Sequence, residues 1–378
     1  MSDETKILIV DDSAVARGML TSIFEGETDF TVVGTASNGE IGLRKVDELQ
    51  PDIVVLDIEM PVMDGLTALE TLKTRHPRLP VIMFSTLTER GAAATVQALS
   101  RGAWDYAAKP GQTTSLAAAR EAVRQELVAK ARAIAGKIGK GGAARGLASR
   151  PSARPAPARS VPSRHTTSTI DAVVLGSSTG GPVALETVLS AIKTPLRVPL
   201  FVVQHMPPKF TEALADRLDR KTASRVVEGA HGMRAEPGTV YIAPGGRHMV
   251  INNRGAMPTV EIIDTPPVNS CRPSVDVMFE SAIKVYGAHM LGVMLTGMGA
   301  DGAKAAANMA KLGSPFLAQD EATSIVWGMP GAVVDAGSAS EVLPLESIGP
   351  RIAEIVFRST PSRGRGTTTG HEKVVAQS

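Results

Sequence analysis

The chain has 378 residues and a net charge of +2, and 43% of its residues are hydrophobic while 21% are charged. This composition is typical of a soluble globular protein and argues against wholesale disorder, and the length predicts two domains. No apolar run approaches the roughly 18 residues that cross a membrane, so we expect a cytoplasmic protein without membrane insertion. The single cysteine, Cys271, excludes an intramolecular disulfide, and we interpret it as a bystander.

Residues 1–126 are predicted to form the first domain, because short apolar runs alternate there with helical patterns. The apolar runs are KILIV, TVVGTA, DIVVLD, VIMFS and DYAAK, and each is followed by a helical stretch. Tandem units of strand and helix form a parallel sheet with helices on both faces. The sequence therefore predicts a doubly wound α/β domain.

Polar residues of an unusual kind follow these apolar runs. Asp11 and Asp12 follow the first run, Asp57 ends the third, Ser85 ends the fourth and Lys109 ends the fifth. Strand ends converge in a doubly wound sheet, so the three carboxylates would repel one another unless a cation such as Mg²⁺ lies between them. Asp57 could then attack a phosphoryl group, to which Ser85 donates and with which Lys109 pairs. The alternative is that each acid only caps the helix after it.

Residues 127–169 are predicted to be a flexible linker. Between Glu126 and Asp171 the chain carries nine Lys or Arg residues and no acid, and the segment is rich in Gly, Ala, Ser and Pro. Such a segment has little to bury and stays extended. Because the basic charge belongs to the linker and not to a folded face, we expect no nucleic-acid partner.

Regular alternation resumes in residues 170–357, which are predicted to form a second doubly wound, mostly parallel domain of Rossmann-like type. Its strand-like runs are DAVVLG, PLFVVQH, TVYIAP and HMLGVMLTG, with helical patterns after Pro182, Lys209 and Asp301. Residues 358–378 lack such a pattern, and we predict a disordered tail.

A sharp turn is predicted where the second domain begins. Gly176, Ser178 and Gly180 have the G-x-S-x-G spacing of a nucleophile elbow, in which the glycines permit a turn that exposes the serine hydroxyl. Ser178 is therefore the candidate nucleophile, and Ser177 is only the variable residue of the motif. A Gly-rich turn between a strand and a helix could instead cradle a phosphate, and this motif alone does not decide between the two.

A serine nucleophile needs a base and an acid that orients the base. His205 follows the run PLFVVQ, and Asp301 follows the run MLGVML after a Gly-rich turn, so both are expected at the same edge of the sheet as Ser178. Taken singly, His205 could be a surface residue and Asp301 a helix cap. The order Ser, His, Asp differs from that of α/β-hydrolases, chymotrypsin and subtilisin, which indicates a triad on another scaffold.

Residues from Ile7 to about Ala119 resemble the response-regulator receiver family, through ILIVDDSAVAR, VVLDIEMPVMDG and the KP pair. The resemblance implies a flavodoxin-like fold, a histidine kinase as phosphodonor and Asp57 as the phosphoacceptor. It also implies that Mg²⁺ is bound by Asp11, Asp12, Asp57 and the backbone carbonyl of Glu59. Two further implications are a cis peptide between Lys109 and Pro110 and a switching role for Tyr106.

Residues from about Ala172 to Val356 resemble the catalytic domain of CheB-type chemotaxis protein-glutamate methylesterases, through GSSTGGP, QHMPPKFT, YIAPGGRHM and LTGMGADGA. The resemblance implies a triad of Ser178, His205 and Asp301, with no cofactor in this domain. It further implies that the Met298 backbone N–H serves an oxyanion hole and that Thr179 lines the site. Ala300 stands where relatives often carry Asn.

The substrates implied by this resemblance are methylated glutamates of chemoreceptors, and many family members also deamidate receptor glutamines. It also implies that the unphosphorylated receiver covers the active site and that phosphorylation relieves this inhibition. We expect a monomer. The rival interpretation joins the receiver to a DNA-binding or nucleotide-sensing module, but strands alternate with helices here and no compact helical domain is indicated.

Overall fold

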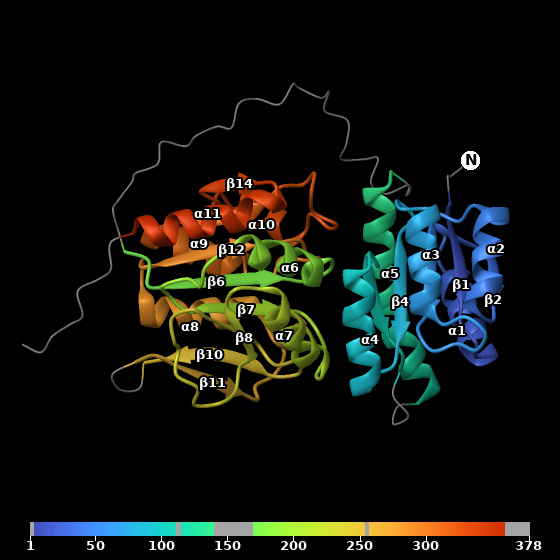
Figure 1. The fold of residues 1–378 in the computed structure, drawn as a ribbon, viewed down its shortest axis with the longest axis horizontal. Coiled ribbons are helices and arrows are strands. Elements are labelled where there is room, and N and C mark those ends of the chain that lie inside the picture. Colours follow the sequence, from blue (N-terminus) through green and yellow to red (C-terminus); the bar gives the residue numbers. More distant parts are fainter. Residues whose placement is uncertain (1–3, 111–114, 140–168, 254–256, 360–378) are drawn as a thin grey trace, which may run out of the picture.

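The computed structural model describes residues 4–110, 115–139, 169–253 and 257–359. Two α/β domains lie side by side, the receiver-like domain at the right of Figure 1 and the larger domain at the left. Within the described ranges, no helix combines the length and the apolar character needed to cross a membrane.

The first domain has one five-stranded sheet in the order β2-β1-β3-β4-β5, and every neighbouring pair of strands is parallel. This is the flavodoxin-like order, so the predicted fold class is confirmed. Its strands are β1 (Thr5–Val10), β2 (Phe30–Ala36), β3 (Ile53–Asp57), β4 (Val81–Ser85) and β5 (Asp105–Ala108). Its helices are α1 (Ala14–Phe24), α2 (Gly39–Leu49), α3 (Gly65–Arg75), α4 (Glu89–Ser100) and α5 (Leu116–Lys137).

Local sequence explains where these helices begin. A polar residue before each of the five helices accepts a hydrogen bond from the backbone N–H three positions later, which satisfies one of the free donors of the first turn. These capping residues are Ser13, Asn38, Asp64, Thr88 and Ser115.

Helix α5 runs to Lys137, so the domain boundary predicted after residue 126 falls inside the helix. Leu127, Val128, Ala131 and Ile134 are almost fully buried and continue the apolar face of the helix against the first domain. The spacing of these residues is helical, but the basic residues between them resemble the linker that follows. The remainder of the predicted linker and nearly all of the predicted tail lie outside the described residues.

The second domain has a seven-stranded sheet in the order β14-β13-β12-β6-β7-β9-β8, in which all neighbouring strands are parallel, and a separate antiparallel pair, β10-β11. Its strands are β6 (Ala172–Ser177), β7 (Leu200–Gln204), β8 (Arg225–Glu228), β9 (Thr239–Ile242), β10 (His248–Asn252), β11 (Thr259–Ile263), β12 (Met290–Met294), β13 (Phe316–Gln319) and β14 (Glu341–Leu343). Its helices are α6 (Gly181–Ala191), α7 (Phe210–Lys221), α8 (Val275–Tyr286), α9 (Ala303–Leu312), α10 (Met329–Asp335) and α11 (Leu345–Arg358). The predicted mostly parallel, doubly wound domain is confirmed.

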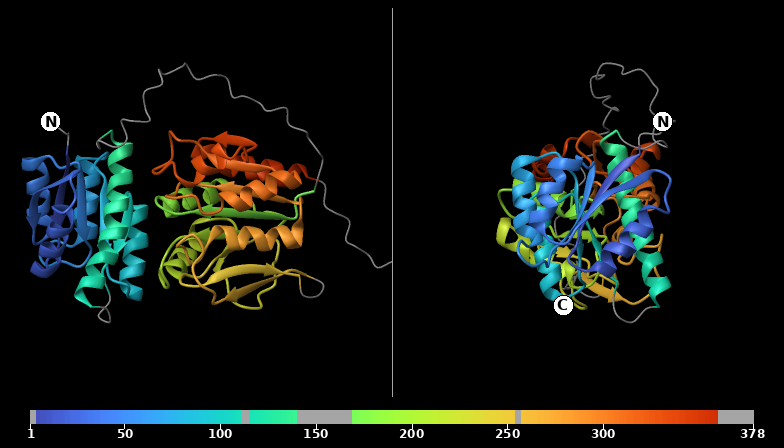
Figure 2. Two further views of the ribbon diagram at one scale, coloured as in Figure 1. Left: turned by 180° about the vertical axis from the view of Figure 1, so that it is seen from behind. Right: turned by 90° about the vertical axis from the view of Figure 1, so that its right-hand side faces the viewer.

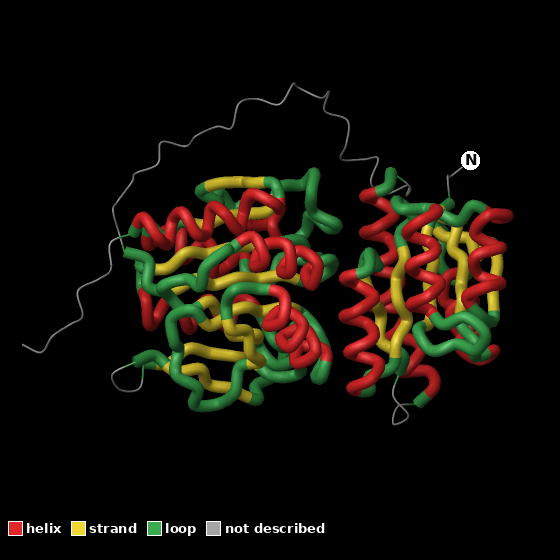
Figure 3. Tube along the Cα trace, viewed as in Figure 1, coloured by secondary structure: helices red, strands yellow, loops and turns green. Residues whose placement is uncertain are grey.

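Helices flank the strands of both large sheets, as the two further views in Figure 2 and the tube coloured by secondary structure in Figure 3 show. Every residue of β3, β6, β7 and β12 is buried. A strand covered on both faces must be apolar along its whole length and not only at alternate positions. This is why the sequence shows continuous apolar runs at these positions.

Candidate phosphorylation site and candidate active site

Charged side chains meet at the carboxyl ends of β1, β3 and β5 in the first domain. Lys109 Nζ lies 2.9 Å from Asp11 Oδ2 and 2.8 Å from Asp57 Oδ2, and both carboxylates are almost fully buried. Backbone N–H groups hold the other oxygens, since Ile58 donates to Asp57 Oδ1 at 2.7 Å and Ser13 donates to Asp11 Oδ1 at 2.9 Å. One lysine therefore faces two buried carboxylates.

The electrostatics of this site follow from that imbalance. Burial raises the pKa of Asp57 to about 6; Lys109 opposes this shift, and the neighbouring charge of Asp11 adds to it. Burial lowers the pKa of Lys109, but its hydrogen bonds and charge interactions with Asp57 and Asp11 outweigh burial and raise it. The site consequently has unneutralised negative charge that a further cation would balance.

The carboxylates fit a hard divalent cation. Asp11, Asp12 and Asp57 bring one oxygen each to within 4.8 Å of one another, and Lys109 is the one cation in contact with Oδ2 of both Asp11 and Asp57 among the described residues. Clustered carboxylate oxygens are the ligands that Mg²⁺ prefers. The side chain of Glu59 turns instead towards Arg90, at 3.6 Å.

The structure overturns one expectation about this site and leaves the role of Ser85 as a prediction. Ser85 is buried at the end of β4, but its hydroxyl donates to the carbonyl of Gly91 at 3.2 Å and not to the acidic cluster. The expected cis peptide between Lys109 and Pro110 is wrong, because the cis peptide found among the described residues is Arg272–Pro273. The two isomers of an X-Pro bond differ by only about 0.5–1 kcal/mol, so the local sequence cannot decide between them.

The turn after β6 exposes Ser178 and buries Ser177. Ser177 is fully buried and donates to Gln204 Oε1 at 2.7 Å, whereas Ser178 is partly exposed. Gly180 has a φ of +75°, a left-handed conformation that favours glycine, just before α6 begins. At Gly181 a Cβ atom would lie 1.9 Å from Gln204 Oε1, so no side chain fits there. Ser178, and not Ser177, is therefore the more accessible serine of this turn.

His205 and Asp301 are in contact beside this turn. His205 Nε2 lies 2.9 Å from Asp301 Oδ2. The order β12-β6-β7 places Ser178, which follows β6, between the strands that lead to Asp301 and His205. Three residues far apart in sequence therefore gather at one edge of the sheet, as the strand pattern predicts.

Asp301 is buried within a dense set of hydrogen-bond donors. Asn269 Nδ2 and Ser274 Oγ donate to Oδ1 at 2.7 and 2.8 Å, and the Val275 backbone N–H donates to Oδ2 at 2.6 Å. Burial raises the pKa of Asp301, but the hydrogen bonds from His205 and Asn269 outweigh burial and lower it. The carboxylate stays ionised and fixes the orientation of the imidazole.

The other nitrogen of His205 faces Cys271 and not the serine. Nδ1 lies 3.6 Å from Cys271 Sγ, and among the described residues no hydrogen bond joins Ser178 Oγ to His205. Burial lowers the pKa of His205, but its interactions with Asp301 and Cys271 raise the pKa to about 9. The loop that precedes α8 thus folds back onto the histidine and places Cys271 beside it, a placement that no pattern in the sequence indicated.

The partners of Asp301 and His205 on this loop were missed by reasoning from strand ends. Asn269, Cys271 and Ser274 lie between β11 and α8, and Asn269 and Ser270 both have positive φ values, of 53° and 62°. The only local signal was the pair of turn-forming residues Asn269 and Ser270, which indicates a turn but not what the turn approaches.

The remaining expected residues lie around the elbow. A Cβ atom at Gly297 would lie 2.9 Å from Ser178 Cβ, so the turn that carries Met298 packs directly against the serine. Thr179 is buried, and its carbonyl accepts a hydrogen bond from Thr296 Oγ at 3.0 Å. Met298 is 40% exposed.

The first domain packs against this part of the second. Helices α4 and α5 lie between the sheet of the first domain and the second domain, and α4 contacts α6 and α7 (Figures 1 and 2). The rings of Tyr106 and Phe210 stack with centroids 5.1 Å apart, and Lys137 Nζ donates to the carbonyls of Glu321 and Ala322 at 2.9 and 2.8 Å.

The interface reaches the elbow itself. Ile325 packs against the core of the first domain and also lies within 3 Å of the position that a Cβ atom would take at Gly180. Asp105, at the start of β5, is fully buried; burial raises its pKa, and the side chain of Thr179 is among the groups that lower it. The first domain therefore contacts Thr179, the residue after Ser178, and also Ile325, which packs on Gly180.

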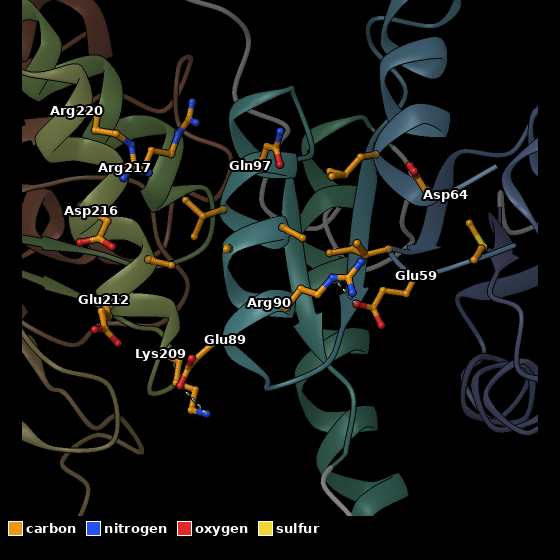
Figure 4. A pocket seen from close by; sticks show the side chains of 17 residues that line it. Glu59, Asp64, Glu89, Arg90, Gln97, Lys209, Glu212, Asp216, Arg217 and Arg220 are labelled. Atoms are coloured by element: carbon orange, nitrogen blue, oxygen red, sulfur yellow. Dashed lines mark ion pairs between the residues drawn. The ribbon is translucent and has the colours of Figure 1, made fainter.

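A polar groove of about 1280 Å³ opens beside this interface. One wall includes Glu59 and Arg90 of the first domain, and the other includes Glu212 and Arg217 on α7 (Figure 4). Glu59 lies two residues after Asp57, so the groove joins the loop after Asp57 to the second domain. An exposed ion pair between Lys209 and Glu89, at 3.5 Å, crosses it.

Comparisons with known proteins match both domains. The model of the CheB methylesterase family matches residues 173–352, and that of the response regulator receiver domain matches residues 7–121. A protein-glutamate methylesterase/protein-glutamine glutaminase of a Nocardioides species is 44% identical over 94% of this chain and 97% of its own. Such a protein of Caulobacter vibrioides is 45% identical over 92% of this chain and 98% of its own. The Thermotoga maritima CheB methylesterase catalytic domain, known from a crystal structure, is 38% identical in sequence and has a TM-score of 0.48 to this chain. The match covers 50% of this chain and 100% of the Thermotoga maritima chain.

Proposed function

Because the chain belongs to the CheB family, in which a receiver domain precedes a methylesterase domain, we propose that Ser178, His205 and Asp301 carry its hydrolase chemistry. The chain is a protein-glutamate methylesterase/protein-glutamine glutaminase with a receiver domain, in the setting of chemotaxis. We assign catalysis to residues 170–357 and phosphorylation to the first domain, which α5 extends beyond the expected boundary at residue 126 to Lys137.

The reaction is an acyl transfer through the serine. His205 Nδ1 takes the proton of Ser178, whose oxygen attacks the ester carbonyl, and the Met298 backbone N–H stabilises the tetrahedral oxyanion while Thr179 lines the site. The protonated imidazole then gives its proton to the methoxide, so methanol leaves, and water hydrolyses the acyl-enzyme in the same way. With a glutamine substrate, ammonia leaves in place of methanol. Asp301 stays ionised throughout.

This mechanism requires one change from the structure. His205 Nδ1, which now faces Cys271 at 3.6 Å, must accept the proton of Ser178 instead. The raised pKa of His205 favours the protonated imidazole, so base catalysis also requires that this proton be released.

Receivers of this family undergo Mg²⁺-dependent phosphorylation. We assign the phosphoacceptor to Asp57 and the metal ligands to Asp11, Asp12, Asp57 and the backbone carbonyl of Glu59. When bound, Mg²⁺ supplies positive charge that balances the carboxylates and the incoming phosphoryl oxygens. Lys109 pairs with the phosphoryl charge, and Ser85 would leave the Gly91 carbonyl to donate to a phosphoryl oxygen.

The partners follow from the family. The phosphodonor is a chemotaxis histidine kinase, the substrates are methyl-accepting chemoreceptors, and the place of action is the cytoplasm, where the helical domains of those receptors lie. The monomer inhibits itself through the interface of α4 and α5 with α6 and α7. Phosphorylation need weaken this interface by only about 1.4 kcal/mol to change the ratio of open to closed forms tenfold.

The observation that carries the proposal is the bond between His205 and Asp301 beside the partly exposed Ser178, at neighbouring strand ends of one sheet. The test is methanol release from a methylated chemoreceptor, with and without a small phosphodonor. We expect slow release without the phosphodonor and faster release with it. No release under either condition would reject the esterase assignment for these residues.

A further inference from the structure

The contact between His205 and Cys271 has the form of a metal site. His205 Nε2 is bonded to Asp301, so Nδ1 is the nitrogen left to bind a ligand, and it faces the only thiol of the chain. A histidine that binds a metal commonly gives its other nitrogen to a carboxylate, which orients the ring. Both His205 and Cys271 are partly exposed, so an ion can reach them from solvent.

The separation of the two ligand atoms fits one tetrahedral ion. Zinc binds imidazole nitrogen at about 2.0–2.1 Å and thiolate sulfur at about 2.3 Å, so two such ligands at a tetrahedral angle lie about 3.6 Å apart. The distance from His205 Nδ1 to Cys271 Sγ is 3.6 Å. The two atoms are therefore separated by the distance that one tetrahedral ion requires.

Asp301 does not itself bind the ion. Its Oδ1 accepts hydrogen bonds from Asn269 and Ser274, and its Oδ2 accepts one from Val275 and lies against His205. Both oxygens are therefore committed, and the protein offers one nitrogen and one sulfur. Water completes the coordination of the ion.

We propose that His205 and Cys271 form a binding site for a zinc-like divalent cation and that its occupation inhibits the hydrolase. When the ion binds, His205 Nδ1 and the Cys271 thiol each release their proton to solvent, and the nitrogen and the sulfur bind the metal. The lone pair of His205 Nδ1 is then bound to the metal and cannot accept the proton of Ser178. Only this inhibition rests on the proposed role of His205; the binding site does not.

The same chain then distinguishes two classes of cation. The cluster of Asp11, Asp12 and Asp57 offers hard oxygen ligands, which suit Mg²⁺, whereas the pair of His205 and Cys271 offers softer nitrogen and sulfur ligands, which suit Zn²⁺ or Co²⁺. Mg²⁺ should therefore support phosphorylation without inhibiting the esterase.

The binding site is tested with Co²⁺ as a spectroscopic probe on the full-length protein. Because Cys271 is the only cysteine, any absorption band from a thiolate bound to Co²⁺ must come from this residue. We expect a band that saturates at one Co²⁺ per chain, is displaced by Zn²⁺, persists in Mg²⁺ and is absent from Cys271→Ser. Absence of the band from the wild-type protein at saturating Co²⁺ overturns the site, whatever the variant does.

The inhibition is tested by the rate of methanol release in a series of Zn²⁺ concentrations, each variant being compared with its own rate in a chelator. Loss of the sulfur ligand should raise the Zn²⁺ concentration for half inhibition about 10- to 100-fold in Cys271→Ser. Asp57→Asn is the matched control and should be inhibited like the wild type, because the receiver cluster is not involved. An unchanged half-inhibition concentration in Cys271→Ser overturns the proposal.

The two experiments separate two kinds of failure. A Co²⁺ band without inhibition by Zn²⁺ would overturn the inhibitory role and count against His205 as the catalytic base. No band, together with normal hydrolysis of the receptor ester, would overturn the metal site and leave the proposed function intact.

Discussion

The two domains place reactive groups at the same edge of the same kind of sheet, yet they complete their sites differently. In the receiver, residues at the ends of β1, β3 and β5 bind one another directly, because Lys109 contacts both Asp11 and Asp57. In the hydrolase, a loop between β11 and α8 supplies the donors to Asp301 and the partner of His205. A sheet edge gathers side chains, but the loops above it decide which of them are bonded.

The comparison extends to two aspartates. Asp57 has one backbone donor and one lysine, and burial raises its pKa to about 6, whereas the donors around Asp301 lower the pKa of that residue. A nucleophilic carboxylate must keep a lone pair available and so accepts few hydrogen bonds, while a carboxylate that orients a histidine must be held in place by several. The number of donors around each aspartate thus matches the role proposed for it.

The largest expected effect tests whether the hydrolase site depends on a single hydroxyl. Ser178→Ala should lower methanol release from methylated receptor by about a millionfold, because the nucleophile is lost. The matched variant Ser177→Ala should keep most activity but lose about 1–3 kcal/mol of unfolding free energy, because Gln204 Oε1 loses its buried donor. Urea unfolding and the ester assay measure the two effects. If Ser177→Ala lost activity and Ser178→Ala kept it, the assignment of Ser178 as the nucleophile of the turn would be wrong.

A smaller but still large loss should follow when the carboxylate that orients His205 is neutralised. Asp301→Asn should lower the rate about ten-thousandfold, since an amide donor would favour the wrong tautomer of the histidine. Stability should fall as well, because an amide nitrogen would face donors such as Ser274. Asp276→Asn changes a neighbouring carboxylate that bonds to Asn269 but not to His205, so it should keep most activity. Circular dichroism would show whether both variants are folded. If both are folded and lose activity equally, Asp301 has no special role in orienting His205.

The receiver site should give a smaller effect on hydrolysis, because it acts from a distance. Asp57→Asn should acquire no label from a small phosphodonor in Mg²⁺ and should lose a stimulation of about tenfold in methanol release. Asp64→Asn is the control, since Asp64 caps α3 and asparagine caps equally well. Normal labelling of Asp57→Asn would place the phosphoacceptor at another residue.

The smallest effect concerns the contact between the two domains. Tyr106→Ala removes the stack on Phe210, and because an aromatic pair contributes about 0.5–1.5 kcal/mol, the esterase activity of the unphosphorylated protein should rise roughly two- to tenfold. A fragment that starts near Ser160 should also exceed the unphosphorylated full-length protein. Initial rates at matched concentration measure both.

Two controls accompany this test. Tyr106→Phe keeps the ring and should keep the low activity, and Lys209→Ala should change the rate less than twofold, because its ion pair with Glu89 joins exposed side chains. Low activity in a folded Tyr106→Ala protein, together with low activity in the fragment, would mean that the receiver does not hold the hydrolase closed.

Much of the fold was predictable because most strands coincide with an apolar run that can be recognised in the sequence. The strands β3, β6, β7 and β12 are apolar except for a polar last residue in the first three, since both faces of these strands are buried, and the polar residues at or after the strand ends mark the edge of the sheet. The end of α5 was less predictable, because Leu127 and Ile134 are buried among basic residues that resemble the linker.

The sequence by itself determined two parallel-sheet domains, the edge at which Ser178, His205 and Asp301 lie, and the family to which the chain belongs. Only the tertiary structure decided which atoms meet there. Asn269 reaches Asp301 across 32 positions of sequence, and Cys271 reaches His205 across 66. Burial on both faces of a strand leaves a local pattern that can be recognised, whereas the approach of a loop to a distant residue depends on how the whole chain packs.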